Sequence, residues 1–231
     1  MKKIAIVLGI AFALCIGFVP TKKAEAVGSL NLFDNKSMCF GAETYTFKPG
    51  YNLFSLPYDL WQKDPRFFFI DALGKPIPID GRLTRWDNQT QKEIIYDKNH
   101  PEIFGKLKLG DYYWLNVDKK RTVWVAGICS QKEQVIKLYP GWTSFGYNFR
   151  NDQEATNAVV RNIKTGTTMT MLQANNLSLL TAAMFTFEAD DQSGYDTCDP
   201  DFYCNRTKIQ KWHGYMFNVF SNDLELIIPA K

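Results

Sequence analysis

Hydrophobic and polar residues alternate along much of this chain, and a period of two is the pattern of a β-strand with one buried face. The clearest case is the segment DYYWLNVDKKRTVWVAG at residues 111–127, where two alternating runs flank a polar turn at residues 118–121. We expect a β-hairpin here. Its inward-facing side chains would be Tyr113, Leu115, Val117, Thr122, Trp124 and Ala126.

The same order of landmarks occurs twice along the chain. KPGYNLFSLPYDL at residues 48–60 recurs as YPGWTSFGYNFRN at residues 139–151, an offset of 91, and YWLNV at residues 113–117 recurs as YMFNV at residues 215–219, an offset of 102. Such a repeat predicts two copies of one supersecondary unit. Because no linker rich in Pro, Gly or Ser separates them, we expect an all-β protein of two tandem homologous modules, β-sandwich or barrel-like, packed together.

The two offsets differ, which predicts an insertion in the second copy. Residues 169–183, MTMLQANNLSLLTAA, favour a short helix there, and Trp86 then aligns with Phe187. The expected order is a signal peptide at residues 1–26, an N-terminal lead strand at 27–44, and modules at 45–130 and 131–231.

Several short motifs punctuate the first module: Gly50-Tyr51-Asn52, Leu56-Pro57, Trp86, Tyr96, Tyr112-Tyr113-Trp114 and Gly127. In this order they resemble the GWN…GYW-type β-repeats of secreted and surface proteins of bacteria and archaea. The second copy diverges from that pattern, with Thr143 where the repeat has Asn and Met216 where it has Trp. The resemblance implies a secreted, β-rich accessory or surface module with no defined chemistry.

The N-terminus has the parts of a secretory signal peptide. Lys2 and Lys3 precede an apolar run at residues 4–19, and Ala24-Glu25-Ala26 supplies a small-x-small cleavage pattern. A run of sixteen residues is shorter than the roughly twenty that span a bilayer, although a retained anchor stays open as an alternative. We expect cleavage before Val27 and a secreted, periplasmic or cell-surface protein without a stable membrane anchor.

Cleavage would remove four of the 27 basic and one of the 24 acidic residues, leaving 23 of each. The mature chain is then formally neutral, which gives no support for a nucleic acid or an anionic lipid surface as partner. The expected partners are further copies of this chain or other envelope and extracellular proteins, with polysaccharide as an alternative.

Four cysteines remain after cleavage. An even number in an exported chain favours two disulfides. Of the three connectivities we favour Cys39–Cys129 with Cys198–Cys204, because the first pair brackets the first module and the second closes a short loop. No pair of Cys or His residues has the spacing of a zinc site.

Two tryptophans are candidate ligand contacts. Trp114 lies on the strand face opposite Leu115, and Trp61 precedes a polar loop, so both could stack on the faces of sugar rings. The alternative is that these rings pack in the core, as aromatic residues in strands often do. For Trp86 and Trp142, which sit at landmarks of the repeat, we expect the core.

The segment EADDQSGYDTCDPDFYCN is a weak candidate for a calcium site, since calcium binds clusters of carboxylate oxygens. A solvated acidic loop is the alternative, because the spacing does not match an EF-hand. The candidate ligands are Asp190, Asp191, Asp196, Asp199 and Asp201.

No catalytic motif is present in the sequence, neither a nucleophile elbow nor a phosphate loop, a zinc-protease helix or a dinucleotide fingerprint. We therefore expect a non-catalytic exported structural or interaction protein that can associate with itself, without a cofactor other than calcium. A carbohydrate-binding module using exposed aromatic side chains is the first alternative, and an uncharacterised secreted hydrolase is the second.

Overall fold

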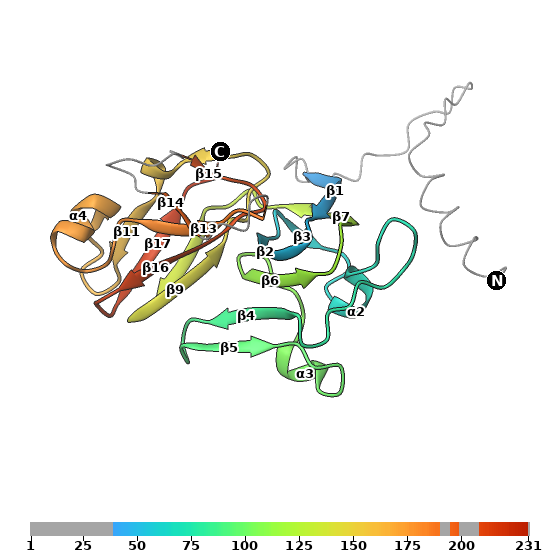
Figure 1. Ribbon diagram of the computed structural model, residues 1–231. Coiled ribbons are helices and arrows are strands. Elements are labelled where there is room, and N and C mark those ends of the chain that lie inside the picture. Colours follow the sequence, from blue (N-terminus) through green and yellow to red (C-terminus); the bar gives the residue numbers. More distant parts are fainter. Residues whose placement is uncertain (1–38, 190–194, 199–207, 231) are drawn as a thin grey trace, which may run out of the picture. The chain divides into compact units, whose positions relative to one another are not determined.

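The computed structural model describes residues 39–189, 195–198 and 208–230, and these form an all-β protein (Figure 1). Residues 39–130 are called the N-terminal half and residues 131–230 the C-terminal half. The N-terminal strands are β1 (Phe40–Phe47), β2 (Gly50–Ser55), β3 (Tyr58–Leu60), β4 (Leu83–Asp87), β5 (Lys92–Ile95), β6 (Tyr112–Val117) and β7 (Arg121–Cys129), with short helices α2 (Pro65–Phe68) and α3 (Pro101–Phe104). Strand β1 crosses the boundary expected at residue 45.

The C-terminal half has ten strands among the described residues: β8 (Gln134–Leu138), β9 (Gly141–Gly146), β10 (Gln153–Glu154), β11 (Val159–Asn162), β12 (Thr168–Thr170), β13 (Met184–Phe187), β14 (Tyr195–Cys198), β15 (Lys208–Ile209), β16 (Gly214–Val219) and β17 (Leu224–Ile228). A 3-10 helix, η1 (Ala155–Asn157), and helix α4 (Met171–Asn176) complete it. Helix α4 lies within the expected insertion but is shorter than the predicted segment. Thr170 and Gln173 form a capping box at its start, which fixes where it begins.

Two antiparallel sheets of each half have the same strand order, and the C-terminal half has the two-stranded sheet β10-β15 in addition. The order β1-β7-β3 in the N-terminal half corresponds to β8-β17-β11 in the C-terminal half, where β12 adds a further edge strand. The order β2-β6-β4-β5 corresponds to β9-β16-β13-β14. Each half thus buries its apolar residues around its own pair of sheets, in one cluster that includes Phe54 and Leu115 and another that includes Phe145 and Phe217.

The pairing register is also the same in the two halves. Gly50 lies opposite Val117, and Gly141 lies opposite Val219, as the offsets of 91 and 102 require. In the next strand pair, Thr84 lies opposite Trp114 and Phe185 opposite Met216. The offset from Thr84 in β4 to Phe185 in β13 is 101, which is also the offset at which Trp86 aligns with Phe187.

The hairpin expected at residues 111–127 is wrong. Strand β6 pairs with β2 and β4, whereas β7 pairs with β1 and β3, so the turn between them carries the chain from one sheet to the other. The inward side chains of β7 are Val123 and Val125, and Trp124 is 63% exposed. The alternating pattern was continued through a turn that in fact joins two sheets. The prediction therefore assigned the wrong set of alternate residues in β7 to the buried face. In the C-terminal half the alternate residues Leu224, Leu226 and Ile228 of β17 are buried.

The disulfide between Cys39 and Cys129 is confirmed. It joins the start of β1 to the end of β7, beside a backbone hydrogen bond of 2.9 Å from the Cys129 amide to the Cys39 carbonyl. The other expected disulfide involves Cys204, which lies outside the described residues, as does the expected signal peptide. No helix in the described part of the chain is long and apolar enough to cross a membrane.

Candidate binding grooves between the two halves

The sheet β2-β6-β4-β5 turns its second face toward β9 and β16 of the C-terminal half. Leu53 and Ser55 point away from the core of their own half and are nevertheless buried. The Ser55 hydroxyl donates a 3.0 Å hydrogen bond to the carbonyl oxygen of Tyr147. The halves approach closely because Gly146 has no side chain: a Cβ there would lie 2.0 Å from the Asp111 carbonyl oxygen. This contact makes the two halves one packed structure.

Side chains from the β4–β5 turn hydrogen-bond to the open edge of β9. The Asn88 amide donates to the Ser144 carbonyl and accepts from the Ser144 amide, both at 2.8 Å. Gln91 makes the same paired contact with Trp142, at 3.0 and 2.8 Å. Two amide side chains therefore replace a neighbouring strand and cover an edge that would otherwise offer unpaired backbone groups.

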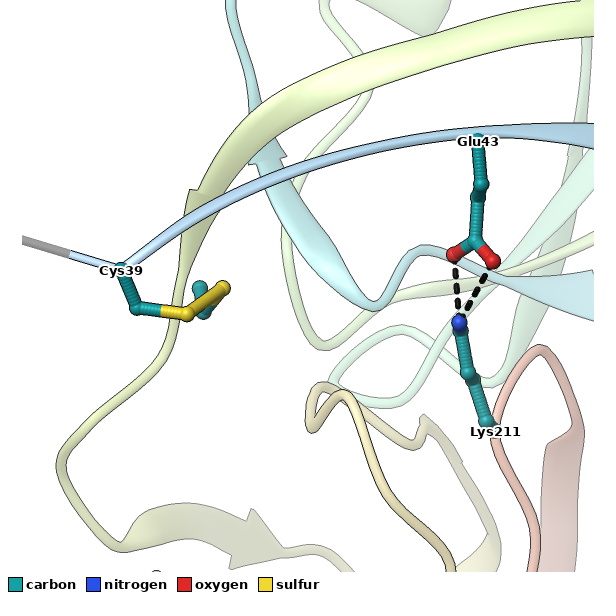
Figure 2. The surroundings of a disulfide bond; sticks show 4 residues. Cys39, Glu43 and Lys211 are labelled. Carbon is teal, nitrogen blue, oxygen red and sulfur yellow. Dashed lines mark hydrogen bonds and ion pairs between the residues drawn. A yellow bond between two sulfur atoms is a disulfide. The ribbon is translucent and has the colours of Figure 1, made fainter.

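A second contact joins β1 to the C-terminal half. The Lys211 ammonium lies 2.5 and 2.6 Å from the two carboxylate oxygens of Glu43 (Figure 2). It also lies 5.6 Å from the ring centre of Tyr58, and burial together with the Glu43 carboxylate raises the pKa of Tyr58 to about 12. The neighbouring Trp212 stacks on Tyr45, with ring centres 4.4 Å apart.

One open groove, the Trp114 groove, is lined by residues of both halves, and its volume is about 510 Å³. Trp114 is its central ring, 5.0 Å from the ring centre of Phe187, 6.1 Å from that of Tyr195 and 6.3 Å from that of Tyr51. Tyr51 and Tyr195 are more than half exposed. The groove is lined by Tyr51, Gly81, Arg82, Thr84, Glu93, Ile95, Trp114, Asn116, Phe187 and Tyr195.

The Trp114 groove also carries charge. Arg82 and Glu93 are exposed, and neither forms an ion pair with another described residue. Burial, with a smaller contribution from Glu93, raises the pKa of Tyr195, so its hydroxyl stays protonated and able to donate. The lining thus combines apolar ring faces with hydrogen-bonding groups.

A second groove, the Trp142 groove, is more apolar and has a volume of about 440 Å³. It is lined by Trp86, Tyr112, Trp142, Ser144, Phe185, Tyr195 and Met216. The expectation that Trp86 and Trp142 lie in the core is wrong: Trp142 is 43% exposed, and the Trp86 indole donates a 2.9 Å hydrogen bond to the Trp142 carbonyl. Both rings project from the strand face that turns away from the core of their own half.

The two grooves use equivalent positions of the two halves. One member of each register-equivalent pair lines one groove, and the other member lines the other groove. The pairs are Tyr51 and Trp142, Thr84 and Phe185, Trp114 and Met216, and Phe187 and Trp86. The residues at these equivalent positions differ, so the Trp114 groove carries polar side chains whereas the Trp142 groove is almost wholly apolar.

The two tryptophans singled out in the sequence lie on different surfaces. Trp114 lines the groove described here, whereas Trp61 is 67% exposed on the outer face of the β1-β7-β3 sheet, beside Phe40. The sequence did not indicate Arg82 or Glu93, which carry no periodic pattern. Tyr51 follows Gly50 at the start of β2, and strand alternation alone could have predicted that its side chain is exposed.

Of the five candidate calcium ligands only Asp196 is among the described residues, and its carboxylate accepts a 3.0 Å hydrogen bond from the Thr197 amide. Asp190, Asp191, Asp199 and Asp201 lie outside them. Within residues 39–189, 195–198 and 208–230, no group of three or more His, Cys, Asp or Glu side chains could hold a metal ion. The calcium site stays a prediction.

Comparison with known proteins gives this chain no relative: no protein-family model, no curated protein and no solved structure matches it.

Proposed function

We propose that the chain is a non-catalytic, exported binding protein whose Trp114 groove takes a glycan chain. The observation that carries this proposal is the composition of the groove, in which the rings of Tyr51, Trp114 and Tyr195 stand beside hydrogen-bonding side chains. Ligand sites are typically concave and mostly apolar, with a few polar groups that fix orientation. A sugar ring has the matching surface, since its C–H face stacks on an aromatic ring while its hydroxyls bind at the rim.

The charged groups support a neutral, hydroxyl-rich ligand. Arg82 and Asn116 supply donors and Glu93 supplies an acceptor, so the rim can both give and accept hydrogen bonds from sugar hydroxyls. Hydrolysis of a glycosidic bond usually needs two carboxylates. Glu93 is the one acidic side chain among the described residues that line either groove. The groove therefore supports binding better than hydrolysis.

The proposal includes the cellular setting expected from the sequence. A signal peptide at residues 1–26 would bring the chain to the cell surface, the periplasm or the medium, where polysaccharides are abundant. An internal duplication of the GWN…GYW type would account for the shared strand order and register of the two halves. It would also explain why two grooves occur in equivalent places.

A glycan array with the purified chain tests the proposal, followed by titration calorimetry on any sugar that binds. Tyr51→Ala removes an exposed ring and should weaken binding about tenfold or more, which corresponds to a loss of at least about 1.4 kcal/mol. Trp114→Ala should abolish measurable binding. The matched control is Trp142→Ala, which removes the equivalent ring of the other groove and should leave the affinity unchanged.

Thermal unfolding of each variant separates loss of the site from loss of the fold, because Trp114 also packs against Phe187. Absence of any glycan ligand would refute the proposal. So would a glycan that binds Tyr51→Ala as tightly as the original chain.

A further inference from the structure

The outer face of the β1-β7-β3 sheet is apolar and uncovered within the described residues. Four large side chains project from it: Phe40 is 57% exposed, Trp61 67%, Trp124 63% and Ile128 39%. Phe40 and Ile128 are opposite one another on β1 and β7, and the Phe40 ring centre lies 6.3 Å from that of Trp61. Contiguous exposed apolar surface of this kind usually marks an interaction site.

The relief of this face is self-complementary. Along β1 and β7, the large pair Phe40 and Ile128 is followed by the small pair Ala42 and Ala126, and then by Thr44 opposite Trp124. The two alanines form a low patch between two raised rows, and Trp61 bounds it on the side of β3, because the Trp61 amide donates a 3.3 Å hydrogen bond to the Ala126 carbonyl. A second copy turned by a two-fold axis can therefore place its Trp124 ring over the two alanines, and the first copy does the same in return.

The charge pattern also favours a second copy as the occupant. None of the outward residues of β1 and β7 is charged, and the next pair, Thr46 and Thr122, is joined by a 2.8 Å hydrogen bond. Two such faces can meet without burying an unpaired charge, which is the arrangement that stable interfaces need. Asp59 and Lys63 lie at the side of the face and pair with one another at 2.5 Å.

The equivalent sheet of the C-terminal half differs on the same face. The offset of 91 places Lys137 at the position of Thr46, and its opposite neighbour Glu225 at the position of Thr122, so an uncharged pair is replaced by a charged one. Glu225 also forms an ion pair with Arg161. Ile227, at the position of Trp124, is only 7% exposed, so the large exposed ring is no requirement of the fold.

We propose that the outer face of the β1-β7-β3 sheet is a self-association surface, on which a second copy of this chain packs face to face about a two-fold axis. The disulfide between Cys39 and Cys129 holds the adjoining ends of β1 and β7 together, so the face is formed before the partner arrives. Less conformational freedom is then lost on association. This surface is separate from the Trp114 groove, so each can fail without the other.

The test places two opposite charges at Thr44 and Trp124, which face one another on β1 and β7. The full chain is expressed and purified with the double substitution Thr44→Lys and Trp124→Glu, and sedimentation velocity is measured over a hundredfold range of concentration. We expect the original chain to form a dimer, and the double variant to dissociate at least 30-fold more readily, since a central Trp is a typical interface hot spot. The control Leu177→Glu alters an exposed leucine on the other half and should stay dimeric.

Near-ultraviolet circular dichroism confirms that each variant is folded, and Trp124→Ser serves as a second variant that adds no charge. A chain that stays monomeric at every concentration would overturn the proposal. A dimer that survives both Trp124 variants would also overturn it. If the monomeric chain instead binds an insoluble polysaccharide through Trp61 and Trp124, the face is a glycan platform and the proposal is wrong.

Discussion

Trp124 and Ile227 occupy the same position in two equivalent sheets, but Trp124 is 63% exposed and Ile227 only 7%. Their inward neighbours do not diverge in this way: Val123 and Val125 are buried in the first sheet, and Leu226 and Ile228 in the second. Buried positions keep the strands in register, because a slip of one residue would turn the apolar side chains outward. The exposed positions carry no such constraint, so the differences that bear on function gather there.

The turns that open β2 and β9 show a second difference between the halves. Gly50 and Gly141 both have positive φ angles, of 94° and 100°, which other residues rarely adopt. Asn52 then closes the first turn, with hydrogen bonds to the amide and carbonyl of Lys48 at 2.8 Å and to two further carbonyls. Thr143, in the same place of the second turn, makes side-chain hydrogen bonds to the amide and carbonyl of Tyr139. The same backbone conformation is therefore stabilised by four side-chain hydrogen bonds in the first turn and by two in the second.

The largest difference in stability is expected from the disulfide, which only the N-terminal pair of outer strands possesses. Replacing both Cys39 and Cys129 by Ser should lower the free energy of unfolding by about 2–5 kcal/mol, because the bond closes a long loop. Urea unfolding measures the loss. Hydrogen exchange should show that β1 and β7 lose protection while β8 and β17 keep theirs. An equal loss of protection in both halves would contradict the idea that each half has its own core.

The turn comparison predicts a smaller effect. Asn52→Ala should destabilise the chain by about 2–3 kcal/mol, since it removes the four hydrogen bonds of a buried amide side chain. Thr143→Ala should cost about 1 kcal/mol, because its two hydrogen bonds, of 3.4 and 3.1 Å, are long. Urea unfolding of the two variants gives the comparison directly. Equal losses would show that the turn itself, rather than the side chain that closes it, sets the stability.

Much of the fold could be predicted from the sequence, because the buried positions repeat with strand periodicity. The segments around Tyr113 and Tyr215 are strands of the expected phase, and the pairing of Cys39 with Cys129 followed from their places at the ends of the first module. The connection from β6 to β7 could not be predicted. Two alternating segments with a polar turn look alike whether the strands pair with each other or cross to another sheet.

The binding grooves were predicted only in part. Trp114 was identified because it lies opposite Leu115 on its strand, but Trp142 was assigned to the core because it sits at a landmark of the repeat. The face of β9 that carries Trp142 turns toward the other half, and a strand covered by its own core or by another module has the same composition. Tyr195 lies within the acidic segment, whose carboxylates indicated calcium rather than an aromatic groove.

The smallest effect is expected just before β6, where Asp111 holds the place that His213 holds before β16. Burial raises the pKa of Asp111, and the nearby Arg85 and Lys108 offset this only in part. A carboxyl whose pKa is raised by folding favours the folded state below its ordinary pKa and loses that contribution as the pH rises through the raised value. Asp111→Asn should therefore stabilise the chain at neutral pH, and the gain should fade as the pH falls toward 4.

Urea unfolding from pH 4 to pH 8 measures this gain, and Asp64→Asn is the control of opposite sign. The hydrogen bond from the Arg66 side chain lowers the pKa of Asp64, so Asp64 stabilises the folded chain at neutral pH and loses this contribution in acid. Asn at position 64 still caps α2 and loses only the charge. A gain for Asp111→Asn that does not change with pH would mean that packing between the halves, and not the buried charge, distinguishes Asp111 from His213.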